Sequence, residues 1–257
     1  MMIRYIPADP AGNLTAIVLS PVAAQDRAKI AAEMMARCPE GFEQVGFADE
    51  ASLTGDLPTL CMMGGEFCGN ATRAFACYAA KVRGRGETRL AISVSGAREP
   101  VPVAVDLRQN RAYAQMPLPY ALEWISVNKQ KIPLVRMEGI DHALLLDAAP
   151  SPEAVERVLT AMPKQDARGV LFVQGGKMTP LVEVAATGTR VWESSCGSGT
   201  VALAWYLAQN LADGMHALAF DEPGGRLEAR VAMRAGCAAQ IEMGGAVKLG
   251  EEAEIEL

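Results

Sequence analysis

The chain is poor in the features that mark nucleic-acid and membrane proteins. Aromatic residues make up 5% of its 257 residues, so surfaces for stacking bases or sugars are scarce. No apolar run approaches the roughly 20 residues that a membrane-spanning helix needs. The net charge of −6 provides no basic excess for a polyanion. We therefore expect neither nucleic acid nor a membrane as a partner. Half of the residues are apolar, which is enough for packed cores.

Cysteine is also scarce, and the motifs of common cofactors are missing. Six cysteines are too few for a disulfide scaffold, and neither Cys-x-x-Cys nor His-x-x-x-His spacing occurs. No phosphate-binding glycine loop is present, and no lysine is marked out for pyridoxal phosphate. Pro7 and Asp9 lie where a signal peptide would have its apolar core. We expect a cytoplasmic protein with reduced thiols, no metal and no cofactor. Cys38, Cys77 and Cys237 are interpreted as small buried apolar residues.

One segment of the sequence occurs twice. Cys68–Ala80 reads CGNATRAFACYAA and Cys196–Ala208 reads CGSGTVALAWYLA, with seven of thirteen positions identical at a spacing of 128 residues. Composition alone would give about one identity. Each copy is typical of a loop followed by a buried helix. Two copies spaced by half the chain indicate two similar domains facing each other rather than a long repeat array.

The remaining pattern predicts an α+β fold with mixed sheets packed on central helices. Amphipathic helices are expected at Ala23–Ala36 and Pro152–Met162. Strands are expected at Leu14–Leu19, Arg89–Val94, Val101–Leu107, Ala112–Met116, Ala143–Leu146, Val170–Val173, Leu181–Ala186, Leu227–Ala232 and Ala238–Met243. We expect domains at 1–117 and 118–257, with the seam near Pro117–Pro119 and the first half completed by the C-terminal segment.

The two cysteines carry the predicted chemistry. Each opens a helix, where the positive end of the helix dipole lowers a thiol pKa and favours the thiolate. The small residues that follow let an anion approach the first-turn N–H groups. If both helix ends face one cleft, a substrate carboxylate fits between them, with one sulfur on each side of its α-carbon. One thiolate would then remove the α-proton while the other thiol protonates the opposite face, which inverts the centre without a cofactor.

These motifs resemble the diaminopimelate epimerase family of cofactor-independent amino-acid racemases and epimerases. The resemblance covers nearly the whole chain, through Ala11-Gly12-Asn13, Gly41-Phe42-Glu43-Gln44, Glu66–Arg73, Gly139-Ile140-Asp141-His142, Arg190–Glu193, Ser195–Gly199, Gly224–Leu227 and Met243-Gly244-Gly245. It implies two similar β-rich, barrel-like domains, each around a central helix and related by a pseudo-two-fold axis.

The resemblance also implies roles for individual residues. Cys68 and Cys196 would be the acid–base pair, and Glu193 would hold the substrate ammonium group. The substrate carboxylate would bind the backbone of Gly69, Asn70, Gly197 and Ser198, with Asn13 and Gln44 lining the cleft and His142 tuning a thiol. Each supporting residue also has a purely structural interpretation: a buried or capping histidine at His142, an N-cap partner at Glu193, and turn residues at Asn13 and Gln44.

The departures from the family pattern concern specificity. Diaminopimelate epimerases hold a second amino-acid head with asparagines and an arginine, and the aligned positions here are Cys61, Ile140, Gly169 and Ser194. An unpaired charged head in a closed site costs several kcal/mol. We therefore expect a small-molecule substrate with one amino-acid head. Family members that racemise histidine make histidine the leading candidate, with Glu43, Gln44 or Asp49 contacting its side chain.

Other functions stay open at this point. Diaminopimelate epimerase itself is the first alternative. A cysteine hydrolase or transferase would need a histidine-partnered nucleophile, and only His142 and His216 are available. That scheme leaves one Cys-Gly loop unexplained. An amino-acid binding protein would need no thiols, and a redox pair would need both within bridging reach. The sequence also leaves a homodimer open.

Overall fold

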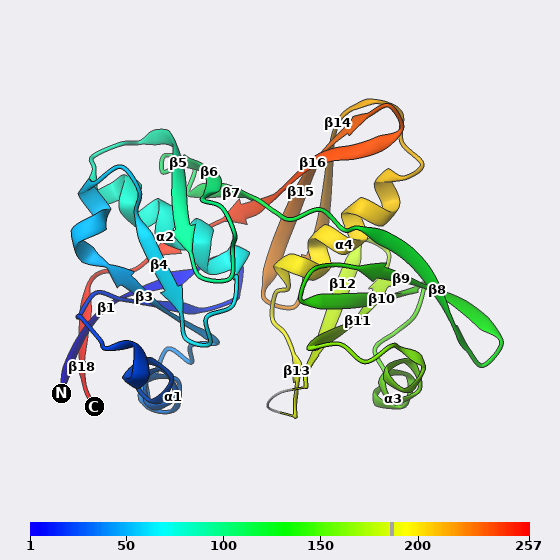
Figure 1. Cartoon of the computed structure of the whole chain (residues 1–257), viewed down its shortest axis with the longest axis horizontal. Helices are drawn as coiled ribbons and strands as arrows, with labels where there is room; N and C mark the ends of the chain where they lie inside the picture. The colour runs from blue at the N-terminus through cyan, green and yellow to red at the C-terminus, as the bar shows by residue number, and fades with distance from the viewer. Residues whose placement is uncertain (186–187) are drawn as a thin grey trace. The chain divides into compact units, whose positions relative to one another are not determined.

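A computed structural model describes residues 1–185 and 188–257 of the chain. The chain forms two compact units (Figure 1). Unit 1 comprises Met1–Gln115 and Gly244–Leu257, and unit 2 comprises Met116–Met243. The C-terminal segment therefore returns to the unit in which the chain begins. No helix within the two described ranges combines the length and the apolar character that crossing a membrane requires.

Unit 1 consists mainly of strands. β1 pairs antiparallel with β17, β18 and β2, and the order then runs from β2 to β7. The pairings of β2 with β3 and of β4 with β5 are parallel, while the others in this series are antiparallel. Its elements are β1 (Met2–Asp9), β2 (Thr15–Val18), η1 (Ala24–Asp26), α1 (Arg27–Arg37), β3 (Gln44–Asp49), η2 (Glu50–Thr54), β4 (Thr59–Met62), α2 (Gly69–Val82), β5 (Glu87–Val94), β6 (Val101–Asp106), β7 (Arg111–Gln115), β17 (Lys248–Leu249) and β18 (Ala253–Glu256).

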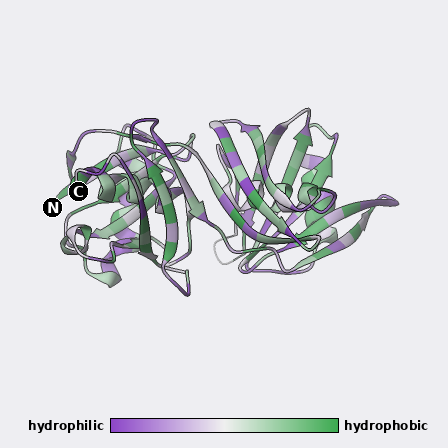
Figure 2. Cartoon of the chain, turned by 90° about the horizontal axis from the view of Figure 1, so that it is seen from above, coloured by the Kyte–Doolittle hydropathy of each residue, from purple (hydrophilic) through white to green (hydrophobic). Residues whose placement is uncertain are grey.

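Helix α2 is the central element of unit 1. Apolar residues from β1, β2, β4, β5, β6 and β7 form one core cluster with α2. Side chains of a strand point alternately to its two faces, and helices cover both faces of β2. Ile17 therefore joins the cluster around α2, while Val18 joins the cluster around α1. Because both faces are covered, all four residues of β2 are buried. Figure 2 shows that hydrophobic and hydrophilic residues alternate along many strands of the chain.

Unit 2 is built from a second set of strands and two helices. β8, β9 and β10 pair antiparallel, β10 and β11 pair parallel, and β11, β12 and β13 pair antiparallel. β14 and β15 form a hairpin. Its elements are β8 (Ala121–Val127), β9 (Gln130–Arg136), β10 (Ile140–Leu146), α3 (Pro152–Ala161), β11 (Ala167–Gln174), β12 (Lys177–Val184), β13 (Thr189–Trp192), α4 (Gly197–Ala208), β14 (Gly214–Glu222), β15 (Gly225–Arg234) and β16 (Cys237–Ala246), whose last residues belong to unit 1.

The alternation of β10 explains why a histidine lies beside α4. Ala143 and Leu145 belong to the core cluster that contains α3. Neighbouring residues on a strand face the opposite side, so His142 points toward α4 and hydrogen-bonds Ser198 in its first turn. The sheet of unit 2 thus carries α3 on one face and α4 on the other.

The predicted mixture of strands and a few helices is confirmed. All four predicted helices exist, and the first begins as the 3-10 helix η1 before α1. Each predicted strand overlaps an observed one, although the end of Leu181–Ala186, at Ala186, lies outside the described residues. The prediction misses β1, β3, β4, β8, β9, β13, β14, β17 and β18. Closed barrels and a pseudo-two-fold axis stay predictions.

One cysteine prediction is wrong. Cys38 and Cys77 are buried as expected, but Cys237 is exposed. It is the first residue of β16 and follows a turn at Ala235 and Gly236, which both have positive φ. A side chain beside such a hairpin turn lies at the end of the sheet, away from the core.

Candidate active site

Cys68 is the N-cap of α2. Its backbone is extended, with φ −124° and ψ 109°, and its sulfur accepts a hydrogen bond from the Ala71 N–H at 3.5 Å. The Thr72 hydroxyl donates to the carbonyl oxygen of Cys68 at 2.7 Å. The sulfur is therefore held against the first turn of the helix, where the helix dipole favours negative charge.

Cys196 has the same local geometry at the start of α4. Its φ is −120° and its ψ is 103°, and its sulfur accepts from the Gly199 N–H at 3.4 Å. The Thr200 hydroxyl donates to the carbonyl oxygen of Cys196 at 2.9 Å. The repeated segment predicted two equivalent loop–helix starts, and the structure confirms this equivalence down to the same two side-chain hydrogen bonds.

A buried arginine supports the first cysteine loop. Arg73 is fully buried, and its guanidinium donates to the side-chain oxygen of Asn70 at 3.1 and 3.2 Å. It also donates to the carbonyl oxygens of Pro10, at 2.7 Å, and Ala246, at 2.9 Å. Arg73 thereby ties the first turn of α2 to the turn that precedes Asn13. Its signal in the sequence was a charged residue inside an otherwise apolar helix.

Two of the predicted binding residues lie side by side at the start of β2 and β3. Asn13 is buried, and its side-chain amide donates to Glu43 at 2.9 Å. The backbone N–H groups of Glu43 and Gln44 both donate to the carbonyl oxygen of Leu14. The side-chain oxygen of Gln44 is buried and has no hydrogen-bond partner among the described residues. A buried acceptor of this kind is available for a donor that the protein itself does not supply.

The second cysteine is connected to His142 through a serine. Ser198 Oγ lies 3.5 Å from the Cys196 sulfur and 3.0 Å from His142 Nε2. His142 Nδ1 is buried without a partner in the described part of the chain. An unpaired buried donor costs more than an unpaired acceptor, so we assign the imidazole proton to Nε2. His142 then donates to Ser198, and the serine hydroxyl is free to donate to the sulfur.

Burial fixes the charge state of His142. The side chain is fully buried, and burial lowers the pKa of His142 to about 3, so the imidazole is neutral near pH 7. Gly169 lies beside it in β11, and a Cβ at position 169 would fall 2.0 Å from Nδ1. The glycine thus makes room for the histidine. We predicted position 169 to shape the far end of the substrate, but its contacts assign it to His142.

Two carboxylates face Cys196. Glu193 accepts a hydrogen bond from the thiol, and Glu222 accepts one from the Cys196 backbone N–H at 2.6 Å. Burial raises the pKa of the Cys196 thiol well above its ordinary value, and the charges of Glu193 and Glu222 raise it further. The hydrogen bond from Ser198 acts in the opposite direction. We expected the helix dipole to lower the pKa of this thiol, but burial and two negative charges act against the dipole and raise that pKa.

Glu222 is the main residue that sequence reasoning missed. It ends β14 and is 7% exposed. Besides the Cys196 N–H, it accepts at 2.6 Å from the Thr200 hydroxyl, whose single proton is shared between Glu222 and the Cys196 carbonyl. The nearby Gly224 N–H donates to the carbonyl oxygen of Ser194 at 2.7 Å. The turn of the β14–β15 hairpin thus packs against the second cysteine loop. The available signal was an acidic residue directly before Pro-Gly-Gly.

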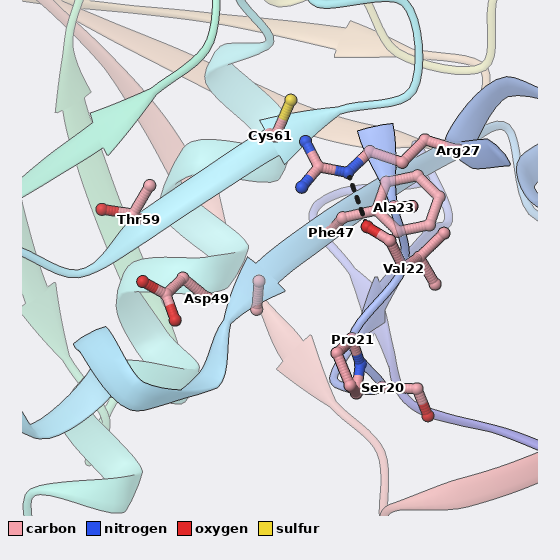
Figure 3. A pocket seen from close by; sticks show the side chains of 10 residues that line it. Ser20, Pro21, Val22, Ala23, Arg27, Phe47, Asp49, Thr59 and Cys61 are labelled. Atoms are coloured by element: carbon pink, nitrogen blue, oxygen red, sulfur yellow. Dashed lines mark hydrogen bonds between the residues drawn. The ribbon is translucent and has the colours of Figure 1, made fainter. Parts of the chain in front are cut away.

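A pocket of about 480 Å³ lies in unit 1, and neither Asn13 nor Asn70 is among the residues that line it. Figure 3 shows Arg27 reaching across it from α1, with its Nε donating to the Val22 carbonyl. Cys61 and Asp49 line this pocket, together with Thr59, Phe47 and Ala48, Arg27, and the segment Ser20–Ala23. Two residues that we expected near the substrate side chain, Cys61 and Asp49, therefore share a pocket that contains neither Cys68 nor Gln44.

The described ranges contain no group of three His, Cys, Asp or Glu side chains arranged to hold a metal ion. Each unit instead presents one cysteine at the start of a buried helix. In unit 1 the following turns of that helix carry Asn70 and Arg73, which hydrogen-bond each other. In unit 2 the groups around the cysteine are Ser198, His142 and two carboxylates.

Comparison with known proteins relates this chain to histidine racemases. Residues 2–255 match the family described as histidine racemase CntK N-terminal domain. The chain is 31% identical over 221 residues to a histidine racemase of Fusobacterium nucleatum subsp. nucleatum, covering 80% of this chain and 81% of that protein.

Two solved structures share the fold. A phenazine biosynthesis protein of the PhzF family from Enterococcus faecalis has a TM-score of 0.67 and 17% identity, with both chains fully covered. A probable proline racemase from Agrobacterium radiobacter K84, with bound carbonate, has a TM-score of 0.65 and 14% identity, covering 99% of this chain and 93% of that one. The chain belongs to the histidine racemase CntK N-terminal domain family and is an isomerase of the amino-acid racemase and epimerase class.

Proposed function

We propose that this protein racemises histidine without a cofactor, using Cys68 and Cys196 as its two proton carriers. The main support is the matched pair of cysteine N-caps, with almost the same backbone angles and the same hydrogen bonds to sulfur and carbonyl. A single nucleophilic cysteine would not need a second, equivalent loop. Membership of a histidine racemase family supports the choice of substrate.

The proposed reaction is a proton exchange at the α-carbon. The thiolate of one cysteine takes the α-proton and becomes a thiol, and the electron pair of the broken C–H bond passes into the substrate carboxylate. The thiol of the other cysteine then protonates the opposite face of the carbon and becomes a thiolate. The reverse reaction exchanges the two roles. Each half of the exchange needs its own sulfur, because one group cannot reach both faces.

The substrate head group is proposed to bind at the helix starts. The backbone amides in the first turns of α2 and α4 lie at the positive ends of two helix dipoles. We assign the substrate carboxylate to the backbone of Gly69, Asn70, Gly197 and Ser198. Stabilising that carboxylate also stabilises the negative charge that develops when the α-proton leaves.

Glu193 is proposed to hold the substrate ammonium group. A carboxylate has two oxygens and can accept from an ammonium group while keeping its bond from the Cys196 thiol. The positive ammonium would offset the charge of Glu193, which raises the pKa of this thiol in the free protein. Substrate binding would therefore ease the formation of the Cys196 thiolate at the moment when it is needed.

The region of Asn13 and Gln44 is proposed to contact the substrate side chain. Gln44 offers a buried oxygen with no partner in the described residues, and an imidazole N–H could donate to it. None of the four positions aligned with the second-head site of diaminopimelate epimerases carries a charge. Gly169 makes room for His142 and Cys61 lines the pocket in unit 1, which leaves Ile140 and Ser194 as candidates for the distal end. Diaminopimelate should therefore be a poor substrate.

A substrate panel tests this proposal. The protein is incubated in D₂O with both enantiomers of histidine, with other L-amino acids and with diaminopimelate, and optical rotation and the α-proton NMR signal are followed. We expect histidine of either hand to lose its rotation and its α-proton faster than the others. Efficient turnover of diaminopimelate, with none of histidine, would overturn the assignment of the substrate.

A further inference from the structure

A carboxylate is anchored beneath the second cysteine by two short hydrogen bonds. Glu222 Oε2 accepts from the Cys196 backbone N–H at 2.6 Å, and Oε1 accepts from the Thr200 hydroxyl at 2.6 Å. Its side chain belongs to β14, whereas both partners belong to the loop and first turn of α4. At 7% exposure, a charge in this place is costly unless its hydrogen bonds compensate it.

Unit 1 offers an internal comparison for this position. The spacing of 128 residues that relates Cys68 to Cys196 relates Val94, the last residue of β5, to Glu222, the last residue of β14. Val94 is a buried apolar residue of the core cluster around α2. The same spacing relates Gly65 to Glu193. Unit 1 therefore has no carboxylate at either of the two positions from which carboxylates face Cys196.

The hairpin itself supports the cysteine loop in both units. In unit 1, the Ser95 hydroxyl donates to the Glu66 carbonyl at 3.0 Å. Gly96 lies so close to this loop that a Cβ would fall 2.2 Å from the Phe67 nitrogen. In unit 2, the Gly224 N–H donates to the Ser194 carbonyl. Because an apolar residue suffices at the end of β5, holding the loop does not by itself explain an acidic residue at the end of β14.

We propose that Glu222 is a positioning residue for Cys196, which fixes the backbone of the cysteine loop and keeps its sulfur protonated in the free enzyme. This inference rests on the proposed two-thiol racemisation. In the free enzyme Cys196 is then the thiol that donates a proton, and Cys68 is the base that removes the α-proton in the first half of the exchange. The role is distinct from that of Glu193, whose carboxylate contacts the sulfur itself and is assigned to the substrate.

The groups around the sulfur are consistent with this role. The charged residues facing Cys196 are Glu193 and Glu222, and both raise the pKa of its thiol in addition to the effect of burial. Ser198 donates toward the sulfur and lowers that pKa. His142 lies behind Ser198 and is neutral because burial depresses the pKa of its imidazole, so it brings no positive charge to the site.

Three variants separate charge from positioning. Glu222→Gln keeps a side-chain oxygen for a hydrogen bond but removes the negative charge. Glu222→Val installs the residue that unit 1 uses and removes both bonds. Asp221→Asn is the matched control, because Asp221 is the neighbouring carboxylate, is exposed, and pairs with Arg226 on the surface.

The test is the alkylation rate of Cys196 by iodoacetamide as a function of pH, with the modified peptide quantified by mass spectrometry. We expect Glu222→Gln to raise the rate at pH 7 about tenfold, by favouring the thiolate, and to lower kcat for racemisation about tenfold. Asp221→Asn should change neither. The alkylation readout needs no substrate, so it stays informative even if histidine is not the substrate.

If Glu222 only stabilised the fold, the Glu222→Gln variant would give a different result. In that case Glu222→Gln would lower the melting temperature while leaving the pH profile of alkylation unchanged, and this result would overturn the proposal. Glu222→Val should lose about 100-fold in kcat, because the loop is no longer held. If the valine variant does not fold, the glutamine variant decides the question alone.

Discussion

The two cysteine loops share their backbone but differ in the charges around them. Cys68 and Cys196 have almost the same φ and ψ, and each sulfur accepts from the N–H three residues later. Near the first loop lies the buried cation Arg73, where α4 has Val201 at the related position. Around the second loop lie Glu193 and Glu222 instead. A duplicated scaffold thus carries two thiols in unlike electrostatic surroundings.

This difference suits a reaction that begins with one sulfur charged and one protonated. Two thiols of equal pKa would titrate together, so much of the protein would hold both sulfurs in the same protonation state. Carboxylates beside the second sulfur favour its thiol form, whereas the charged group tied to the first turn of α2 is the buried guanidinium of Arg73. The comparison shows that the local backbone geometry sets where each sulfur lies. The charged side chains around each sulfur, such as Glu193 and Glu222, favour or disfavour its protonated form.

The largest expected effect comes from removing either sulfur. Cys68→Ala and Cys196→Ala should each reduce kcat/KM by at least about 10³, since each face of the α-carbon loses its proton carrier. Cys237→Ser, at an exposed position, is the control and should retain full activity. Polarimetry with both enantiomers of histidine measures the loss. Full activity in either alanine variant would show that the two loops are not equal partners.

A second prediction concerns His142, which supports only the second loop. Its pKa is about 3 in the folded protein, against an ordinary value of 6.5. Between these values the unfolded chain binds the proton and the folded chain does not, so stability rises with pH. The contribution is fully present above about pH 6.5 and is lost as the pH falls, by about 1.4 kcal/mol per pH unit within this window.

Tryptophan fluorescence follows the unfolding of unit 2, which contains His142, because Trp124, Trp192 and Trp205 all belong to unit 2. Urea unfolding at several pH values from 4 to 7 should show the slope in the parent protein and a smaller slope in His142→Gln. The same slope in both proteins would mean that His142 is not the group responsible.

A third prediction tests the space reserved for that histidine. Gly169→Ala puts a Cβ 2.0 Å from His142 Nδ1, so the imidazole must move and its bond to Ser198 is strained. We expect a loss of about 2–3 kcal/mol in stability and a marked fall in kcat. Gly86→Ala is the matched control in unit 1, where the nearest atom would lie at an ordinary 3.6 Å. Equal stability of the two alanine variants would contradict the packing argument.

The smallest effect compares two threonines at related positions. Thr72→Val removes a hydrogen bond to the Cys68 carbonyl and should cost about 1 kcal/mol. Thr200→Val removes a hydroxyl whose single proton is shared between the Cys196 carbonyl and the buried carboxylate of Glu222, so it should cost about 3 kcal/mol. Urea unfolding followed by circular dichroism gives both values. Similar losses would remove Glu222 from the description of the second loop.

The repeated segment made the central elements predictable. Its Cys-Gly start, threonine and apolar helix fixed α2 and α4 and both cysteine N-caps, because these features depend on residues close in sequence. Strand β1 was missed because Pro7 and the polar residues around it weaken the strand pattern. The tertiary pairing with β2 and β18 overrides this local signal.

The charges around the sulfurs could not be predicted in the same way. Glu222 lies 26 residues after Cys196 and reaches it only because the β14–β15 hairpin packs on the loop. Gly169 likewise acquires its meaning from the parallel pairing with β10. Such contacts depend on how strands are ordered in the sheet, and a single sequence does not contain that information.

The most direct test of the two-thiol account is the isotope content of histidine early in the reaction. L-Histidine is converted in D₂O to a small extent, and the enantiomers are separated before mass analysis. If separate sulfurs serve the two faces, the D-histidine formed carries deuterium at its α-carbon, whereas the remaining L-histidine still carries protium. D-Histidine that retains the protium of its substrate would show that one group moves the proton between the faces, and it would contradict the account.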